Sequence, residues 1–246
     1  MEYVTIGGID LSGDFVACDV KRPLPYVQSE FEHVPGSDGY VLKSADIVPS
    51  PIEFALVMTA KGERERRMAL RRVAPLLTMR EAVDVAFSSD DGLYYKAVPN
   101  GSMELSEFVK SGRMDVVMQP LDAAMYGKQM TFSIYSSTAT SFFVSCSHPV
   151  SPIITATTVR GDNSSGLFGI RLDDGDFMHV EVSKNADHDI VFDCANRTVT
   201  VDGYTSMITL DSDWLEFAPG EHSITRDVGS FGAGGRISAS YDERWL

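Results

Sequence analysis

Hydrophobic and polar residues alternate along most of the chain, in short runs that turn residues separate. In "FALVMT", Phe54, Leu56 and Met58 fall on one side of an extended backbone, because successive side chains of a strand point to opposite faces. The same period recurs in "MDVVMQ", "TFSIY", "MHVEV", "DIVFDC", "TVTV" and "RISASY". Such runs are typical of strands with one buried face, so the pattern predicts a mainly β protein.

One segment, "GERERRMALRRVAPLL" at 62–77, has the period of a helix instead. Acidic residues in its first turn suit the positive end of the helix dipole. Pro75 predicts a kink or an end of the helix near Ala74, because proline lacks the amide hydrogen. At ~100° per residue, one arc of this helix is apolar, and it consists of Ala69, Leu70, Val73, Leu76 and Leu77.

Arg64, Arg67 and Arg71 occupy the opposite arc of the same segment. They indicate either a patch that binds nucleic acid or the solvated face of an amphipathic helix that covers a sheet. The sequence favours the second interpretation, because the 246 residues carry a formal net charge of −14 and phosphate backbones repel such a surface. We therefore expect no tight binding of nucleic acid.

The chain is expected to form two β-sandwich domains. Serine, threonine and proline crowd the stretch "SSTATSFFVSCSHPVSP" at 136–152, which predicts a boundary there. We expect a first domain over 1–135 that holds the helix, a linker over 136–149, and a second domain over 150–246 that is all β.

The composition argues against a membrane or secreted protein. No apolar run approaches the ~18–20 residues that cross a bilayer. The opening "MEYVTIGGID" lacks the basic and apolar regions of a secretory signal. Cys18, Cys146 and Cys194 are odd in number and widely spaced, which favours buried thiols in a reducing compartment.

No catalytic motif stands out in the sequence. The histidines have no metal-ligand spacing, and His179 falls on the polar side of its run, so we expect it at the surface. Asp173, Asp174 and Asp176 indicate either a calcium site or hydrolase carboxylates, but alternation resumes directly after them, which favours a hairpin turn. We therefore predict no metal, no cofactor and no enzymatic activity.

The stretch "HVPGSDGYVL" at 33–42 resembles a glycine-rich phosphate loop at first sight. A phosphate loop needs a helix after its glycines, and the residues that follow here are extended in pattern. Pro-Gly and Asp-Gly are strong turn formers, so we expect a structural turn over Pro35–Gly39.

Four aromatic residues of the second half offer an alternative function, a carbohydrate-binding adhesion module. Tyr204 and Trp214, near Phe217 and Trp245, indicate a face on which sugar rings stack. Burial in the core or in an assembly interface competes with this interpretation, and we favour burial or assembly over sugar.

The order of several segments adds a family resemblance to this picture. In the first half they are "TIGGIDLSGDF", "HVPGSDGYVL", "IEFALVM", the helix, "FSSDDGLYYKAVPNG" and "GRMDVVMQPLD". In the second half they are "HPVSPIITATT", "VFDCANRTVTVDG", "WLEFAPGEHSIT" and "RISASYDERWL". This succession, which covers essentially the whole chain, resembles the distal tail protein family of long-tailed (siphovirus-type) bacteriophages and prophages.

The resemblance implies a structural virion protein, made in the cytoplasm of the bacterial host. Six copies would form a ring, or hub, that joins the tail tube to the tail tip or baseplate and leaves a channel for DNA. The first domain would be tail-tube-like, with one helix and a protruding hairpin, and the second would be galectin-like.

The implied partners are other copies of the chain, the tail-tube protein, the tape-measure protein, and the tail-tip hub (tail-associated lysin) or receptor-binding baseplate proteins. Two segments are our hypotheses for assembly contacts. The first is the turn with Pro35, Gly36, Asp38 and Gly39, and the second is a polar hairpin expected over Asn100–Gly112, with Asn100, Gly101 and Gly112 as its contact residues.

Overall fold

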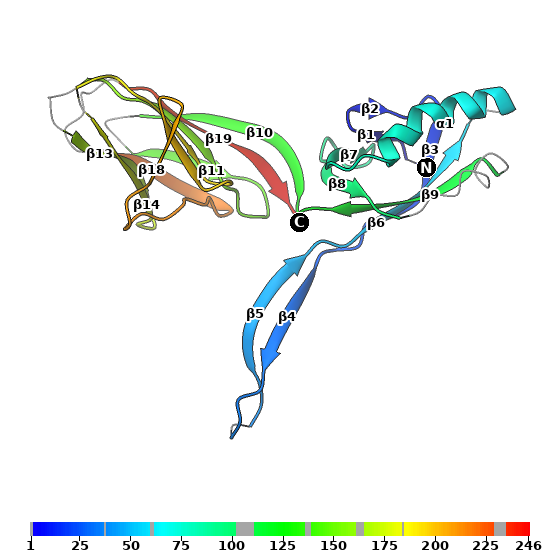
Figure 1. Ribbon diagram of the computed structural model, residues 1–246, viewed down its shortest axis with the longest axis horizontal. Helices are drawn as coiled ribbons and strands as arrows, with labels where there is room; N and C mark the ends of the chain where they lie inside the picture. Colours follow the sequence, from blue (N-terminus) through cyan, green and yellow to red (C-terminus); the bar gives the residue numbers. More distant parts are fainter. Residues whose placement is uncertain are drawn as a thin grey trace. The chain divides into compact units, whose positions relative to one another are not determined.

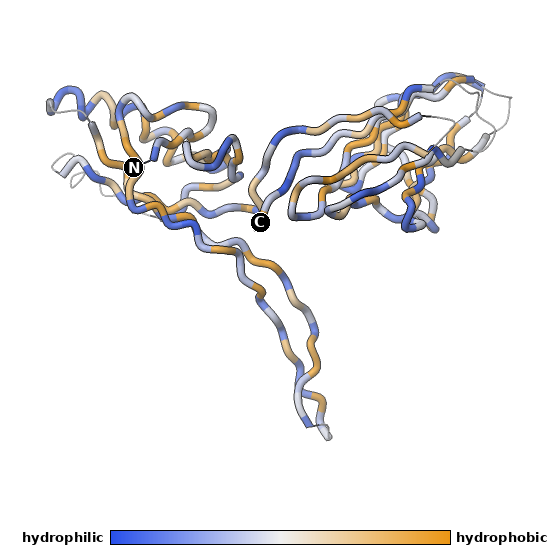
Figure 2. The backbone as a smooth tube through the Cα atoms, turned by 180° about the vertical axis from the view of Figure 1, so that it is seen from behind, coloured by the Kyte–Doolittle hydropathy of each residue, from blue (hydrophilic) through white to orange (hydrophobic). Residues whose placement is uncertain are grey.

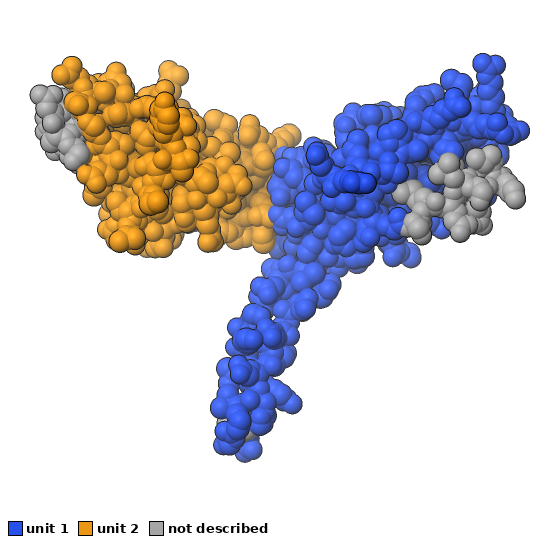
Figure 3. All heavy atoms as spheres, in the orientation of Figure 1, with its two compact units in different colours: residues 1–127, 246 blue, residues 128–245 orange. Residues whose placement is uncertain are grey.

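The computed structural model describes residues 2–36, 38–59, 62–101, 111–135, 139–160, 165–183, 185–228 and 235–246. These residues form a mainly β protein with one helix, which confirms the prediction from the alternation. The chain divides into two compact units, residues 1–127 together with Leu246, and residues 128–245 (Figure 3). No helix in the described part is long and apolar enough to cross a membrane.

Unit 1 contains an antiparallel sheet of seven strands. In the order of the chain, its strands are β1 (Val4–Ile6), β2 (Ile9–Asp10), β3 (Phe15–Lys21), β6 (Ile52–Met58), β7 (Val83–Phe87), β8 (Tyr95–Pro99) and β9 (Arg113–Pro120). They pair in the order β2-β1-β7-β8-β9-β6-β3. The backbone of Glu2 also pairs with Ala17 of β3, so the chain just before β1 joins the opposite edge and the sheet curls towards closure.

The helix α1 (Glu63–Leu77) packs on this sheet (Figure 1), and its buried residues are the five that the sequence predicted. Pro75 does not end the helix near Ala74, because the helix runs on to Leu77. The last two residues, Leu76 and Leu77, are buried, and each gains ~1.5–3 kcal/mol from burial. That gain offsets the ~3 kcal/mol that proline costs inside a helix.

Residues 26–48 of unit 1 form a separate two-stranded hairpin, here called the arm. It consists of β4 (Tyr26–Glu32) and β5 (Val41–Val48), which pair with each other and with no other strand in the described part of the chain. Every residue of β4 is exposed. Figure 1 shows the arm extending away from the sheet of unit 1, and Figure 2 shows hydrophobic residues along both of its strands.

Unit 2 is a sandwich of two antiparallel sheets. The six-stranded sheet has the order β10-β19-β12-β15-β16-β17, with β10 (Met125–Ile134), β19 (Ile237–Trp245), β12 (Ile153–Thr157), β15 (Asp189–Asp193), β16 (Thr198–Val201) and β17 (Tyr204–Ser206). The four-stranded sheet has the order β11-β18-β13-β14, with β11 (Thr140–Val144), β18 (Gly220–Val228), β13 (Ser165–Leu172) and β14 (Phe177–Ser183). One hydrophobic core, with Phe168, Phe192 and Phe217 fully buried, joins both sheets.

The predicted linker over 136–149 differs from the structure. Unit 2 begins at Lys128, and part of the predicted linker forms β11. Phe142 of β11 stacks on Phe132 of β10 with ring centroids 4.5 Å apart. The serine and threonine content suggested a linker, but Phe142 packs this stretch against the core of unit 2.

His179 of β14 is buried, so the expectation of a surface histidine is wrong. Gly169 lies opposite it on β13, and a Cβ atom there would sit 2.0 Å from the imidazole Cδ2. The segment after β17 covers the same strand, since the His179 amide donates to the Ser212 hydroxyl at 2.9 Å. The alternation in the sequence shows on which side of β14 His179 lies. It does not show that the segment after β17 packs over that side.

Candidate assembly surfaces

A β-bulge gives the arm one apolar face. Pairing runs regularly from Tyr26↔Val48 to Glu30↔Ser44, and then Phe31 pairs with Leu42, so Lys43 is an extra residue. Leu42 and Ile47 are five residues apart and would point to opposite faces of a regular strand. The bulge shifts Leu42 onto the face of Ile47. This face of the arm therefore consists of Val27, Phe31, Leu42, Ala45 and Ile47, with Ser29 opposite Ala45, and we call it the apolar face.

The opposite face of the arm carries the acidic residues Glu30, Glu32 and Asp46, together with Tyr26, Val41 and Val48. Lys43 pairs with Glu30 at 3.3 Å. On the apolar face, Val27 is 63% exposed and Phe31 is 61% exposed. An isolated two-stranded hairpin is only marginally stable in water, so an exposed apolar face on it points to a partner surface.

The root of the arm is held by Arg22, which lies between β3 and β4. Its guanidinium bonds to the Asp90 carboxylate, to Glu2 Oε1 at 3.2 Å and to the Ser89 hydroxyl at 3.2 Å. It also lies 5.1 Å from the centre of the Phe87 ring. The network ties the start of the arm to the N-terminal segment and to the turn after β7, which orients the arm on unit 1.

The predicted turn over Pro35–Gly39 lies at the tip of the arm, between β4 and β5. Gly36 has φ +89° and Gly39 has φ +105°, a region that glycine adopts without strain. His33 and Tyr40 face each other across the tip with ring centroids 5.8 Å apart. The turn is confirmed around Ser37, which itself lies outside the described residues, and an assembly contact through Pro35, Gly36, Asp38 and Gly39 stays a prediction.

The second hypothesis for assembly concerns the connection from β8 to β9. Asn100 donates its amide hydrogen to the Val117 carbonyl at 2.8 Å, which continues the pairing of the two strands. Gly112 is buried, has φ +70°, and accepts a bond from the Met58 amide at 2.8 Å. Residues 102–110 lie outside the described part of the chain. The contact role of Asn100, Gly101 and Gly112 therefore stays a prediction.

The outward face of α1 is basic, and it lies opposite the face that covers the sheet. Arg64, Arg67, Met68 and Arg71 line a shallow hollow of about 560 Å³, together with Glu63. Arg67 bonds to Glu63 at 2.6 Å. This agrees with the interpretation of an amphipathic helix that covers a sheet.

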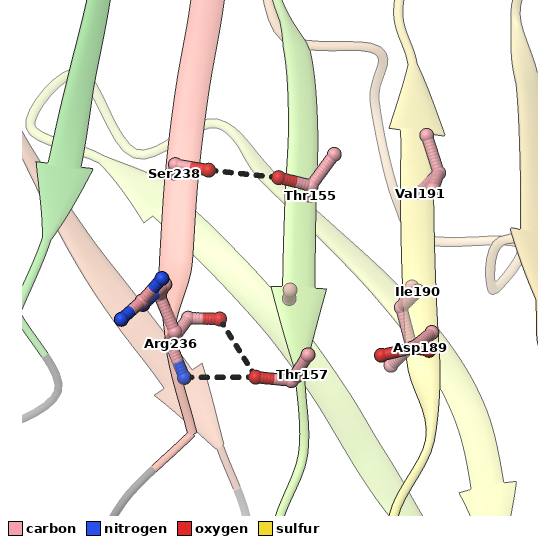
Figure 4. A pocket seen from close by; sticks show the side chains of 8 residues that line it. Thr155, Thr157, Asp189, Ile190, Val191, Arg236 and Ser238 are labelled. Atoms are coloured by element: carbon pink, nitrogen blue, oxygen red, sulfur yellow. Dashed lines mark hydrogen bonds between the residues drawn. The ribbon is translucent and has the colours of Figure 1, made fainter.

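In unit 2, a shallow pocket of about 250 Å³ lies on β12, β15 and β19 (Figure 4). Thr155 and Ser238 hydroxyls bond to each other at 2.8 Å, and the Thr157 hydroxyl accepts from the Arg236 amide at 3.0 Å. These bonds tie the hydroxyl groups to each other and to the backbone rather than to a base. The pocket therefore lacks the nucleophile–base pair of a hydrolase among its described residues.

The aspartates of residues 173–176 form the hairpin turn between β13 and β14, which was the favoured interpretation. Asp173 accepts a bond from the Ser223 amide at 3.1 Å, and Asp174 accepts one from the Asp176 amide at 3.0 Å. The pKa of Asp176 is raised, mainly by the charge of Asp174. No group of three or more potential metal ligands occurs among the described residues.

The thiols are free, as the cysteine spacing predicted. Cys146 and Cys194 are buried, and Cys18 is partly buried. Burial raises the pKa of the Cys194 thiol to about 12. Such a thiol is almost fully protonated at neutral pH, so Cys194 is a poor nucleophile.

The two residues of the sugar hypothesis have different surroundings. Tyr204 on β17 is 79% exposed. Trp214 is partly buried and packs against the core of unit 2. A sugar face built on both rings stays a prediction, with Tyr204 as its exposed member.

Two family models match the chain. The model described as "Phage tail protein RIFT-related domain" matches residues 15–118, and the model described as "Siphovirus-type tail component, C-terminal domain" matches residues 145–245. Each match falls largely within one unit, and together they account for most of the chain. The chain belongs to the distal tail protein family of siphovirus-type phages.

Solved structures share the fold of this distal tail family member. The Dit protein of phage SPP1, described as "a Paradigm of Hub Adsorption Apparatus in Gram-positive Infecting Phages", matches with a TM-score of 0.76 and 17% identity over 100% of both chains. A chain of the phage p2 baseplate in its activated conformation matches with a TM-score of 0.52 and 9% identity over 98% of both chains. No curated protein sequence matches significantly. The protein is thus a structural component of the phage tail and of the virion.

For this distal tail protein, the sequence identified the tip of the arm but not the arm itself. The flanking stretches "YVQSEFE" and "VLKSADIV" contain extended, partly alternating residues that could have indicated its two strands. The five-residue spacing of Leu42 and Ile47 hid the apolar face, because only the bulge brings these residues together. Arg22 had no distinguishing pattern in the sequence.

Proposed function

We propose that the protein forms a closed hexameric ring, the hub that joins the tail tube to the tail tip or baseplate. The observation that carries this proposal is the arm, whose apolar face is left uncovered by the strands of its own chain. Burial of apolar area is the main favourable contribution to association, so a second copy that covers this face would be stabilised.

A ring follows from the kind of contact that an arm makes. When an arm of one copy binds a different surface on the next copy, the contact is heterologous, and heterologous contacts form a ring if the rotation between copies closes. The likeness in fold to the SPP1 hub protein supports this arrangement. We assign the tip residues Pro35, Gly36, Asp38 and Gly39 to contacts between copies, and Asn100, Gly101 and Gly112 to a second contact region.

The proposed ring leaves a channel through which DNA passes. The formal net charge of −14 supports this role, because an acidic wall disfavours adhesion of the phosphate backbone. The proposed neighbours are the tail-tube protein, the tape-measure protein, and the tail-tip hub or receptor-binding baseplate proteins. The role is that of a scaffold without enzymatic activity, since the carboxylates of residues 173–176 serve a turn and Cys194 is protonated.

Negative-stain imaging of the full-length protein tests the ring, both alone and mixed with the tail-tube protein of the same phage. The expected images show six-fold rings with a central hole, and the rings cap tubes at one end. Particles of another symmetry, or rings that never associate with tubes, would refute the proposed position in the tail.

A further inference from the structure

The outward face of α1 is a concentrated basic surface in an acidic protein. Residues 63–77 contain five arginines and two glutamates, a net charge of +3, whereas the whole chain carries −14. Arg64, Arg67 and Arg71 lie along the face turned away from the sheet, and Met68 between them is 51% exposed. We call these four residues the basic stripe.

The basic stripe is only partly neutralised within its own chain. Arg67 bonds to Glu63 one turn away, as exposed helical pairs commonly do. No carboxylate among the described residues pairs with Arg64 or Arg71. By contrast, Arg72 on the flank of the helix bonds to Asp14 at 2.8 Å. The centre of the stripe therefore offers cations to another molecule.

The arm presents the matching charge. Residues 26–48 contain four acidic residues and one lysine, a net charge of −3. Glu30, Glu32 and Asp46 lie on one face of the arm, whereas Asp38 lies at the tip. Glu30 pairs with Lys43, so Glu32 and Asp46 are the carboxylates of this face without an intramolecular ion pair among the described residues. This acidic face spans the length from Gln28 to Glu32, ~14 Å at ~3.4 Å per residue. The basic stripe runs from Arg64 to Arg71, eight residues of helix or seven steps, ~10 Å at ~1.5 Å per residue.

We propose that the acidic face of the arm of one copy docks on the basic stripe of α1 of a neighbouring copy. No ion pair joins α1 to the arm within one copy among the described residues, and Figure 1 shows the arm leading away from the side of unit 1 that carries α1. The contact therefore needs a second copy. This inference rests on the proposed ring, and it identifies the surface of the neighbouring copy to which the arm binds.

The contact between arm and helix would favour one arrangement of neighbouring copies over others. Complementary charges at an interface steer association and fix its register, and their effect falls as salt screens them. Like charge would keep two arms, or two α1 helices, from pairing with each other. Arm-to-helix contacts are then favoured over the symmetric arm-to-arm contact that would stop assembly at a dimer.

The test uses charge reversal in the full-length protein and measures the concentration of half-assembly by mass photometry. The variant R64E/R67E/R71E removes the stripe, and E30K/E32K/D46K reverses the acidic face. Each is expected to raise the half-assembly concentration about tenfold or more, because several opposed charge pairs become repulsive. The variant that combines all six substitutions restores opposite charges on the two surfaces. It is expected to return the half-assembly concentration most of the way to that of the original protein.

The control for R64E/R67E/R71E is R80E/K128E/R160E, which makes the same change in net charge at exposed residues outside the stripe. It is expected to leave assembly within about twofold of the original, because exposed charges far from the contact contribute little. Raising salt from about 50 mM to about 500 mM should weaken assembly of the original protein and leave R64E/R67E/R71E less affected, since screening acts on the contact charges.

The outcomes separate this inference from the ring itself. Six-fold rings whose half-assembly concentration is unchanged in both reversed variants would overturn the docking of arm on helix and leave the ring standing. A protein that stays monomeric at every concentration, alone and with the tail-tube protein, would overturn both. Short duplex DNA that binds the original protein but not R64E/R67E/R71E would also overturn the inference, because the stripe would then serve nucleic acid.

Discussion

Replacing Arg22 by methionine should destabilise unit 1 and loosen the root of the arm. The Arg22 side chain is 24% exposed, and its partners Glu2 and Asp90 are 25% and 11% exposed. Methionine keeps most of the length and the contact with Phe87 but removes the charge. The two carboxylates would then lie near each other, partly buried and without their cation.

The size of the effect follows from burial. Breaking a fully buried ion pair costs ~3–5 kcal/mol, whereas an exposed pair contributes ~0–1 kcal/mol. The Arg22 network lies between these limits, and Asp90 Oδ2 is already buried without a hydrogen-bond partner in the described structure. We therefore expect Arg22→Met to lower the free energy of unfolding of unit 1 by about 2 kcal/mol.

Two spectroscopic probes distinguish the units in this assay. Trp214 and Trp245 are the tryptophans of the chain, and both belong to unit 2. In a urea titration, tryptophan fluorescence should keep its midpoint, while far-UV circular dichroism should show an earlier transition of unit 1. Lys21→Met is the matched control, because the Lys21–Glu53 pair is 72% and 49% exposed and its loss should cost under ~0.5 kcal/mol. Equal effects of the two variants would refute the reasoning.

Three further predictions concern unit 2. Gly169→Ala should lower its unfolding free energy by at least ~2 kcal/mol, because the new Cβ would meet His179 Cδ2 at 2.0 Å; the urea midpoint of tryptophan fluorescence checks this. As a comparison in unit 1, a Cβ at Gly13 meets nothing within 4 Å, so Gly13→Ala should leave the unit 1 transition in far-UV circular dichroism unchanged. Cys194 should resist thiol reagents in the folded protein at pH 8, since its pKa is raised to about 12. An unfolded thiol ionises near pH ~8.5, so the free energy of unfolding should fall as pH rises from there towards the folded pKa, by up to ~1.4 kcal/mol per pH unit. Cys194→Ala should remove this contribution to the dependence of stability on pH. An unchanged dependence would contradict the raised pKa of Cys194. Asp202 has a lowered pKa, first through its bond with His188, so its stabilising contribution is present above the ordinary carboxyl pKa and is lost as pH falls through the folded value. Asp202→Asn should therefore lower the midpoint at pH 7, and its difference from the original protein should shrink as pH falls below the ordinary carboxyl pKa; a difference that does not shrink would count against the pair.

Much of the fold could be predicted because local patterns and burial agree in it. The five apolar residues of α1 are the ones that pack on the sheet, and strands β9 and β19 bury the residues that alternation assigned. Period and hydrophobicity suffice where one face meets a core and the other meets water. The helix continues past Pro75 because Leu76 and Leu77 pack in the core, a tertiary effect that the local pattern does not show.

The candidate surfaces were harder to predict, because they depend on partners that are distant in sequence. The apolar face of the arm exists only through the bulge at Lys43, which no composition rule shows. His179 and Gly169 fit together across two strands, and Arg22 meets Glu2 and Asp90 from three separate segments. The serine-rich start of unit 2 became strand because Phe132 and Phe142 stack, a contact that also lies beyond local sequence.

The mass of the particle in solution, with and without the apolar face of the arm, tests the central claim most directly. Native mass spectrometry would compare the full-length protein with V27S/F31S/I47S, whose changes fall on exposed side chains and should leave the circular dichroism unchanged. We predict six times the 26.9 kDa of one chain for the original protein and a single chain for the variant at the same concentration. Hexamers of equal abundance in both would show that the apolar face of the arm does not hold the ring together.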